Sequence, residues 1–303
     1  MKKKFGFIGV GNLGAHLATN LLRAGFAVVV YDLDRDAAER LIEAGGVCAS
    51  SPKQAVESVD TVITCLPSPA AVAAVMTGEN GILAGLKAGG TWIDMSTNDL
   101  NEVKRLAALA ADNGIACLEA PVTGGVHKAA EGDITVLVGG DKTVYEEHLP
   151  AFQAMGGTII YMGPLGNASV IKVITNMLAF IHLVAVGEAL MLAKRGGLDL
   201  TTAFEAIKAS SGNSFVHETE SQVILNGSYN IGFTMDLACK DLLLANRLGR
   251  AFDVPLELGA LVEQMFIRAR AQYGGKAWSS MVVKLLEDAL DTELRAPGFP
   301  EVL

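Results

Sequence analysis

The chain has 303 residues, half of them hydrophobic, and a formal net charge of −9 at pH 7. Because a single hydrophobic core rarely serves more than about 250–300 residues, this length predicts two domains. The negative charge argues against nucleic acid as the main partner. The four cysteines are scattered and form no CxxC pair, which indicates neither a disulfide framework nor a zinc site. We therefore predict a cytoplasmic protein without a metal site.

The first half of the chain alternates β-rich runs with helical stretches. Most of the runs are continuously apolar, which is typical of parallel strands that are buried on both faces. The pattern predicts an α/β fold with a doubly wound sheet. The predicted strands are residues 5–10, 27–32, 61–66, 91–96, 115–120, 134–140 and 158–163.

From about residue 164 the sequence predicts helices and no strand. The stretch "ASVIKVITNMLAFIHLVAVGEALMLAKRGG" predicts one helix of about 30 residues that ends at Gly196–Gly197. We therefore predict two domains that this long helix joins. The first is the α/β domain over residues 1–163, and the second is an all-helical domain over residues 164–303. Further helices are predicted at 201–210, 214–227, 236–251, 255–273 and 279–288.

The long predicted helix also has the length of a membrane span between Val170 and Leu192. It contains Lys172, Asn176 and Glu188, and such side chains are costly inside a bilayer. We therefore predict a helix buried in protein and no membrane partner.

In "GFIGVGNLG" the motif Gly9-x-Gly11-x-x-Gly14 follows a predicted strand directly and opens a helix. In this context Gly9 permits the tight turn, Gly11 admits a pyrophosphate to the backbone, and Gly14 allows close helix packing. Asp32 ends the next strand, where a carboxylate binds the ribose hydroxyls and repels a 2′-phosphate. The pattern predicts NAD rather than NADP, although Arg35 leaves NADP open.

Polar loops follow three more predicted strands, at the sheet edge where such folds bind ligands. The segment "CLPSP" (65–69) contains Leu66 and Pro67, and "DMSTND" (94–99) contains Ser96 and Thr97. The segment "EAPVTGG" ends in 123–125, a Thr-Gly-Gly turn whose hydroxyl and amides suit a carboxylate.

These motifs, together with "GPLGNASVIKVITN" and "CKDLLLA", resemble the β-hydroxyacid dehydrogenases of the 3-hydroxyisobutyrate dehydrogenase type over nearly the whole chain. The resemblance implies that Lys172 is catalytic and that Asn176 binds substrate. The family's Ser-Gly-Gly loop matches Thr123–Gly125, and Lys240 matches a lysine close to cofactor and substrate. Ala168 stands where the family usually has glycine.

The resemblance also implies a Rossmann-type N-terminal domain, an all-helical C-terminal domain and a homodimer or homotetramer. The predicted substrate contacts are Ser96, Thr123, Gly124, Gly125, Asn176 and Lys240. The predicted cofactor contacts are Gly9, Gly11, Asn12, Leu13, Gly14, Asp32, Leu66, Pro67, Thr97 and Lys240.

Lys172 and Asn176 project from the same side of a helix, four residues apart, within an apolar stretch. Burial disfavours the charged form of an amine, so a lysine there suits proton transfer near neutral pH. We predict NAD-dependent oxidation of a 3-hydroxy acid to its semialdehyde, or the reverse reduction, with Lys172 as general acid/base. His127 and His217 remain candidates for substrate contact, whereas His148 is predicted to be structural.

Two other functions remain open on the sequence alone. One is an imine reductase of related fold, although such enzymes usually lack the catalytic lysine. The other is a non-catalytic nucleotide-binding protein. The sequence does not select among hydroxyisobutyrate, glycerate, hydroxybutyrate, threonate, serine and larger hydroxy acids.

Overall fold

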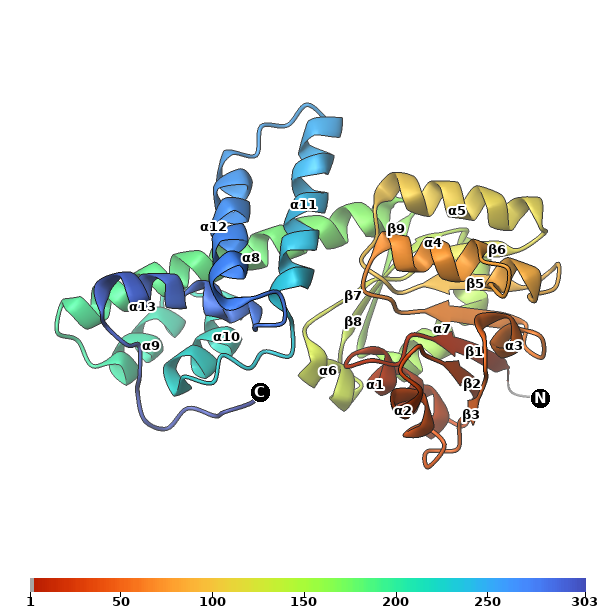
Figure 1. Cartoon of the computed structure of the whole chain (residues 1–303), viewed down its shortest axis with the longest axis horizontal. Helices are drawn as coiled ribbons and strands as arrows, with labels where there is room; N and C mark the ends of the chain where they lie inside the picture. The colour runs from red at the N-terminus through yellow and green to blue at the C-terminus, as the bar shows by residue number, and fades with distance from the viewer. Residues whose placement is uncertain (1–2) are drawn as a thin grey trace. The chain divides into compact units, whose positions relative to one another are not determined.

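A computed structural model describes residues 3–303 of the chain. Its contacts divide the chain into two compact units, one that ends at Lys172 and one from Val173 to Leu303 (Figure 1). The division falls within one long helix, whereas the sequence placed the domain boundary at residue 163, just before that helix.

The first unit is built on a nine-stranded sheet in the order β3-β2-β1-β4-β5-β6-β8-β7, with β9 paired to β8. The strands from β3 to β6 are all parallel, and their order is that of a doubly wound dinucleotide-binding sheet. The predicted doubly wound fold is therefore confirmed. The strands are β1 (Lys4–Ile8), β2 (Ala27–Tyr31), β3 (Val47–Cys48), β4 (Thr61–Thr64), β5 (Thr91–Asp94), β6 (Ala116–Glu119), β7 (Val122–Thr123), β8 (Thr135–Gly140) and β9 (Thr158–Gly163).

The sheet departs from the predicted parallel pairing at β8, which is antiparallel to both β6 and β7. After β6 the chain passes through β7 and the short helix α6 (Val126–Glu131) near the carboxyl end of β6. It then re-enters the sheet from that end, so β8 runs back along β6. The strands β3 and β7 have two residues each, which is too short to give a sequence pattern.

Two apolar layers cover the faces of the sheet. Leu17 on α1 and Phe152 on α7 belong to one cluster, and Val72 on α4 and Leu106 on α5 belong to the other. Each of these side chains is fully buried, which stabilises the fold by about 1.5–3 kcal/mol per side chain. The helices of this unit are α1 (Gly14–Arg23), α2 (Arg35–Glu39), α3 (Pro52–Val56), α4 (Pro69–Thr77), η1 (Ile82–Ala84), α5 (Leu100–Asp112), α6 and α7 (Lys142–Met155).

The regular elements of the second unit are all helices, apart from one isolated bridge between Thr234 and Trp278. Its core gathers residues such as Leu183, Leu242 and Phe266 from three different helices. The helix predicted at 279–288 is divided into a 3₁₀ turn and a short α-helix. The elements are α8 (Asn167–Arg195), α9 (Leu200–Lys208), α10 (Phe215–Asn226), α11 (Met235–Ala251), α12 (Glu257–Tyr273), η2 (Ser279–Val282) and α13 (Lys284–Leu290).

By its length and composition, helix α8 could cross a membrane. Of its most apolar stretch of 18 residues, 33% is buried inside the protein. Phe180 and Leu190 pack into the helical core, whereas Leu178 and Leu192 are exposed. The sequence predicted a helix buried in protein, and the structure shows that only one side of it is buried within this chain.

Candidate active site

The glycine loop has the geometry that its three glycines predict. Gly9 has φ +94°, and a Cβ atom there would overlap the carbonyl oxygen of Cys65. A Cβ atom on Gly14 would overlap the carbonyl of Gly9, whereas one on Gly11 would meet nothing within 4 Å. Helix α1 then begins without a side-chain cap at Leu13. The loop thus leaves open space in front of a helix N-terminus, which fits the pyrophosphate of a dinucleotide.

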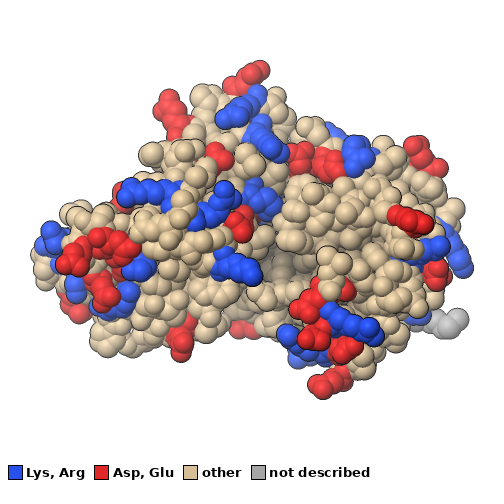
Figure 2. Space-filling view, viewed as in Figure 1, with Lys and Arg blue, Asp and Glu red and all other residues tan. Residues whose placement is uncertain are grey.

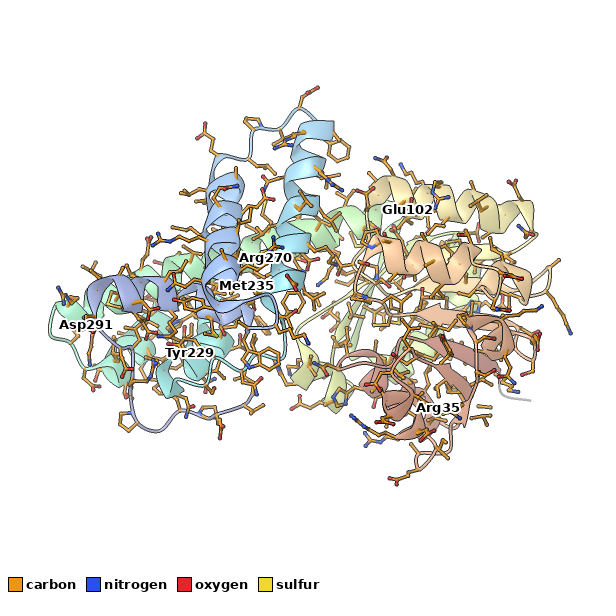
Figure 3. The ribbon with its side chains drawn as sticks, in the orientation of Figure 1. Arg35, Glu102, Tyr229, Met235, Arg270 and Asp291 are labelled. Atoms are coloured by element: carbon orange, nitrogen blue, oxygen red, sulfur yellow. The ribbon has the colours of Figure 1, made fainter. Side chains whose placement is uncertain are left out.

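Asp32 lies beside this loop at the end of β2. Its Oδ2 accepts a hydrogen bond from the Val10 amide at 2.7 Å, and its Oδ1 accepts one from the Asp34 amide at 2.9 Å. A carboxylate has about four acceptor positions, so capacity for ribose hydroxyls remains. Arg35 is exposed on α2 and pairs with Glu39 at 3.1 Å (Figure 3). In this arrangement the carboxylate of Asp32 is fixed at the strand end, while Arg35 pairs with a residue of its own helix.

A buried carboxylate organises the loops that follow β4 and β5. Asp94 accepts hydrogen bonds from the Thr64 hydroxyl at 2.9 Å, the Ser96 amide at 3.1 Å and the Asn98 side-chain amide at 2.9 Å. Burial raises the pKa of Asp94, and these donors oppose that rise. The Ser96 hydroxyl in turn accepts a hydrogen bond from the Leu66 amide at 2.9 Å and is itself buried. Ser96 therefore links the two loops that carry Leu66, Pro67 and Thr97 among the predicted cofactor contacts.

The Thr-Gly-Gly turn requires its two glycines. Gly124 has φ +125° and Gly125 has φ +91°, a backbone region that side chains rarely adopt. Thr123 precedes them in β7, opposite Thr135 of β8. The His127 ring lies close by, because a Cβ atom on Gly125 would be 2.9 Å from its Cε1 atom. Partial burial lowers the pKa of His127, which favours the neutral ring.

The start of α8 is held by Glu119, at the end of β6. Its carboxylate accepts hydrogen bonds from the amides of Gly166 at 2.6 Å, Ala168 at 2.8 Å and Ser169 at 3.1 Å, and a short one from the Ser169 hydroxyl. Lys172 follows one helical turn later and is 8% exposed. The sequence-predicted lysine is therefore a buried side chain near an anchored helix start.

In the helical unit, Asn176 belongs to a second polar cluster. Its side-chain amide donates to Oδ2 of Asp241 at 2.6 Å, and Oδ1 of Asp241 pairs with the Lys240 ammonium at 2.8 Å. Asp241 is 1% exposed. Lys240 and Asp241 are therefore part of a largely buried network and not an ordinary solvated ion pair.

Comparisons with known proteins agree over both units. Residues 4–163 match the NAD-binding domain of 6-phosphogluconate dehydrogenase, and residues 166–286 match the NAD-binding domain of NADP-dependent 3-hydroxyisobutyrate dehydrogenase. The chain is 35% identical to 2-(hydroxymethyl)glutarate dehydrogenase of Eubacterium barkeri, over 94% of this chain and 95% of that protein. It is 34% identical to the NAD-dependent L-serine dehydrogenase of Pseudomonas aeruginosa, over 94% and 98% of the two chains. The chain belongs to the β-hydroxyacid dehydrogenase family.

A solved structure extends this likeness to three dimensions. The 3-hydroxyisobutyrate dehydrogenase of Mycobacterium tuberculosis with L-serine is 31% identical, covers 94% of this chain and 99% of its own, and superposes with a TM-score of 0.85. These comparisons confirm the predicted family, the predicted fold class and NAD as the cofactor. They also confirm the predicted enzyme class, an oxidoreductase that acts on the CH–OH group of a hydroxy acid. The comparisons cover both NAD- and NADP-linked relatives.

The buried histidines of the dehydrogenase have structural partners. Both ring nitrogens of His217 are engaged, Nδ1 with the Ser221 hydroxyl at 3.2 Å and Nε2 with the Phe204 carbonyl at 2.9 Å. His217 is fully buried, and its ring is therefore not exposed for the substrate contact that the sequence left open. His148, predicted to be structural, is also buried and contacts the Thr61 hydroxyl at 2.9 Å.

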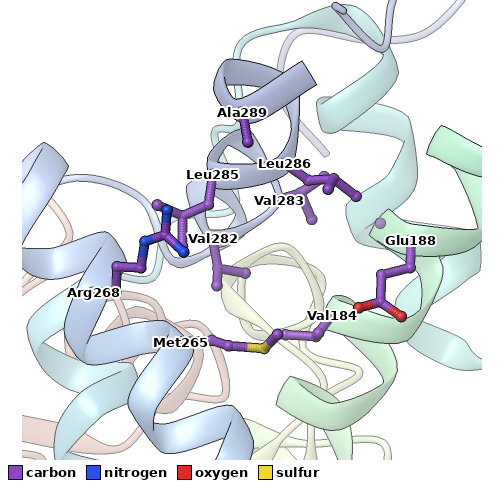
Figure 4. Close-up of a pocket in the computed structure, with 10 residues that line it drawn as sticks. Val184, Glu188, Met265, Arg268, Val282, Val283, Leu285, Leu286 and Ala289 are labelled. Carbon is purple, nitrogen blue, oxygen red and sulfur yellow. The ribbon is translucent and has the colours of Figure 1, made fainter. Parts of the chain in front are cut away.

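The helical unit also has a shallow cleft of about 160 Å³ (Figure 4). Its walls are mostly apolar, with Glu188 from α8 and Arg268 from α12 as the charged members. None of the predicted site residues is among those that line it, which are Val184, Gly187, Glu188, Met265, Arg268, Val282, Val283, Leu285, Leu286 and Ala289.

The sequence did not single out Asp94 or Glu119. Both are buried acidic residues at the end of an apolar strand, and they lie side by side on the paired strands β5 and β6. An acidic residue at the end of a strand buried on both faces needs donors nearby, and this is the signal that would have found them.

Proposed function

We propose that this dehydrogenase oxidises a small 3-hydroxy acid to its semialdehyde, and catalyses the reverse reduction, with Lys172 as general acid/base. The observation that carries the proposal is the burial of Lys172, 8% exposed, on α8 one turn before Asn176. An amine with little access to water exchanges its proton with a bound substrate rather than with solvent. The family membership supplies the reaction class.

The chemistry at Lys172 follows from its two protonation states. A bound NAD would supply the hydride acceptor for the carbon that carries the substrate hydroxyl. The neutral Nζ of Lys172 takes the hydroxyl proton as the C=O bond forms, and in the reverse direction its ammonium returns that proton to the forming alkoxide. Asn176 aligns the hydroxyl, and its hydrogen bond to Asp241 fixes the amide for this purpose.

The substrate class rests on the Thr-Gly-Gly turn and on the named substrates of the relatives. L-serine, 3-hydroxyisobutyrate and 2-(hydroxymethyl)glutarate all carry a primary hydroxyl on the carbon β to a carboxylate. We propose that Thr123–Gly125 holds this carboxylate, because the turn combines a threonine hydroxyl with the backbone amides of two successive glycines that have positive φ. Lys240 is proposed as a further contact to substrate and cofactor.

For the cofactor we propose NAD in preference to NADP. Gly9, Gly11 and Gly14 would hold the pyrophosphate, with Asn12 and Leu13 between them, and Asp32 would bind the ribose. The loops with Leu66, Pro67 and Thr97 would border the nicotinamide. A 2′-phosphate would lie next to the Asp32 carboxylate, which repels it.

We also infer a homodimer or homotetramer in the cytoplasm, without nucleic acid or membrane as partner. Exposed apolar side chains on the helical unit, among them Leu192, Phe252, Leu258 and Leu261, support self-association. On the face drawn in Figure 2, Lys and Arg side chains of the sheet unit lie among Asp and Glu rather than in a separate basic patch. Light scattering after size-exclusion chromatography tests the assembly.

The reaction is tested by a substrate screen. Purified protein is mixed with NAD and one of L-serine, 3-hydroxyisobutyrate, glycerate or 2-(hydroxymethyl)glutarate, and reduced cofactor is followed by absorbance. Turnover of at least one of them above the matching simple alcohol is expected. Reduction of a cyclic imine with no turnover of any hydroxy acid would overturn the proposal in favour of an imine reductase.

A further inference from the structure

We propose that Glu119 is a positioning residue for catalysis, and that its carboxylate fixes the start of α8 and thereby the place of Lys172. The inference rests on the proposed role of Lys172 as general acid/base. It concerns a residue 53 positions before that lysine in the sequence, on a different element.

The first amides of α8 depend on Glu119. A helix leaves its first N–H groups without intrahelical partners. Here the amides of Gly166, Ala168 and Ser169 donate to the Glu119 carboxylate, which also accepts the Ser169 hydroxyl. Glu119 is 1% exposed, and a negative charge at a helix N-terminus is favourable.

Other helices of the same unit are capped locally. Asp99 caps α5 and Asp141 caps α7, each from the residue just before its helix. The start of α8 instead is bound to a strand in the middle of the sheet, between β5 and β8. A local cap moves with its helix, whereas a carboxylate on a central strand holds the helix to the sheet.

The sheet around Glu119 leaves space for its carboxylate. Its antiparallel partner on β8 is Gly139, and a Cβ atom on Gly139 would overlap Oε1 of Glu119. Gly139 does not have a positive φ, so glycine is required there by space and not by backbone conformation. The alanine variant of Gly139 is therefore a second way to displace the carboxylate.

The residues of α8 that Glu119 holds lie close to Lys172 along the helix. Ser169 and Ala168 precede Lys172 by three and four residues, so they lie about one turn before it on the same side of α8. A shift or rotation of the first turn moves the Lys172 side chain with it. A misplacement of about 1 Å can cost about 10²-fold in rate.

The test compares Glu119→Gln and Gly139→Ala with wild type. Gln has the shape of Glu, but it presents an N–H₂ group to donors and removes the charge. We expect kcat for hydroxy-acid oxidation to fall by about 10–100-fold in both variants, with KM and the Kd for NAD within about threefold. Ser169→Ala is a milder variant, because it removes one donor and retains the carboxylate. It tests the inference even if the other two variants fail to fold, and we expect its kcat to fall by about threefold or more.

Asp141→Ala is the matched control, because it removes a cap from α7, whose amides at Thr143 and Val144 donate to that carboxylate. It should lower stability and leave kcat unchanged. An equal loss of kcat in Asp141→Ala would show that the Glu119 effect is general destabilisation, and would overturn the inference.

Lys172→Ala and the double variant with Glu119→Gln separate this inference from the proposed function. If Lys172→Ala retains its activity, the proposed function fails. If Lys172→Ala is impaired and Glu119→Gln and Ser169→Ala both keep wild-type kcat, Glu119 does not position the lysine. In the Lys172→Ala background we expect Glu119→Gln to have no further effect on the residual rate. A further loss there as large as in wild type would also overturn the inference.

Discussion

The side-chain amide of Asn176 on α8 donates a hydrogen bond of 2.6 Å to the buried carboxylate of Asp241 on α11. The same carboxylate pairs with Lys240 at 2.8 Å. One acidic side chain thus orients two residues that the sequence assigns to the substrate.

Asp241→Asn should raise KM for the hydroxy acid by about tenfold. The variant leaves Lys240 without its carboxylate, and hydrogen bonds to a charged partner contribute about 1.5–3 kcal/mol. The free energy of unfolding should also fall, because one member of a buried pair is removed. Steady-state kinetics and urea unfolding measure the two effects. The control is Glu102→Gln, which breaks an ion pair with Arg105 on the surface of α5 (Figure 3). It should change KM and the free energy of unfolding only slightly. An unchanged KM in Asp241→Asn would contradict the role of Asp241.

Lys172→Ala should lower kcat by about 10²–10⁴-fold, the usual contribution of general acid–base catalysis. Lys172→Arg should fail as well, because a guanidinium does not release its proton near neutral pH. Kinetics and an NAD titration on each variant are the measurements, and the Kd for NAD should stay close to wild type. Lys208→Ala, an exposed lysine on α9, is the control. If Lys172→Ala keeps more than about a tenth of the wild-type kcat with chemistry rate-limiting, the base is another group.

Asp32→Ala should narrow the preference for NAD over NADP, measured as the ratio of kcat/KM values. The carboxylate at the end of β2 is fixed by the amides of Val10 and Asp34, so its charge is held at a defined position where it would face the ribose of a bound cofactor. Asp36→Ala removes an exposed carboxylate four residues further on and should leave the ratio unchanged. A wild-type protein that prefers NADP tenfold would show that Arg35 dominates instead.

Much of this fold can be predicted from the sequence because its strands are buried apolar runs with helices between them. Seven of the nine strands coincide with such runs. The reversed direction of β8 could not be predicted, since an apolar run has the same pattern in both directions. The two-residue strands β3 and β7 exist only through their pairing with longer neighbours.

Of the candidate site, too, the sequence could predict some parts and not others. Gly9–Gly14, Asp32 and Thr123–Gly125 form local motifs whose spacing alone indicates their use. The partners that hold the polar residues in place are remote in sequence: Glu119 is 47 positions before Gly166, and Asp241 is 65 positions after Asn176. No local pattern relates these pairs, so the sequence predicts groups for the chemistry but not the contacts that orient them.

Glu220 on α10 provides a prediction that is independent of the active site. Among residues 3–303, its buried Oε2 atom has no hydrogen-bond partner. Desolvation raises its pKa from 4.5 to about 8. Below about pH 4.5 both the folded and the unfolded protein bind this proton. Between about pH 4.5 and 8 only the folded protein does, so the stability contributed by this group falls as the pH rises.

Glu220→Gln keeps the shape of the side chain and removes its titration. The melting temperature of the variant relative to wild type should therefore rise steadily from pH 5 to about pH 8 and level off above it, where wild-type Glu220 is ionised in both states. Thermal unfolding at one-unit intervals from pH 5 to 9 gives this difference. Glu205→Gln, an exposed glutamate on α9, should give a difference that does not change with pH. A Glu220→Gln difference that is equally flat would mean that the carboxylate of Glu220 is ionised in the folded protein at neutral pH.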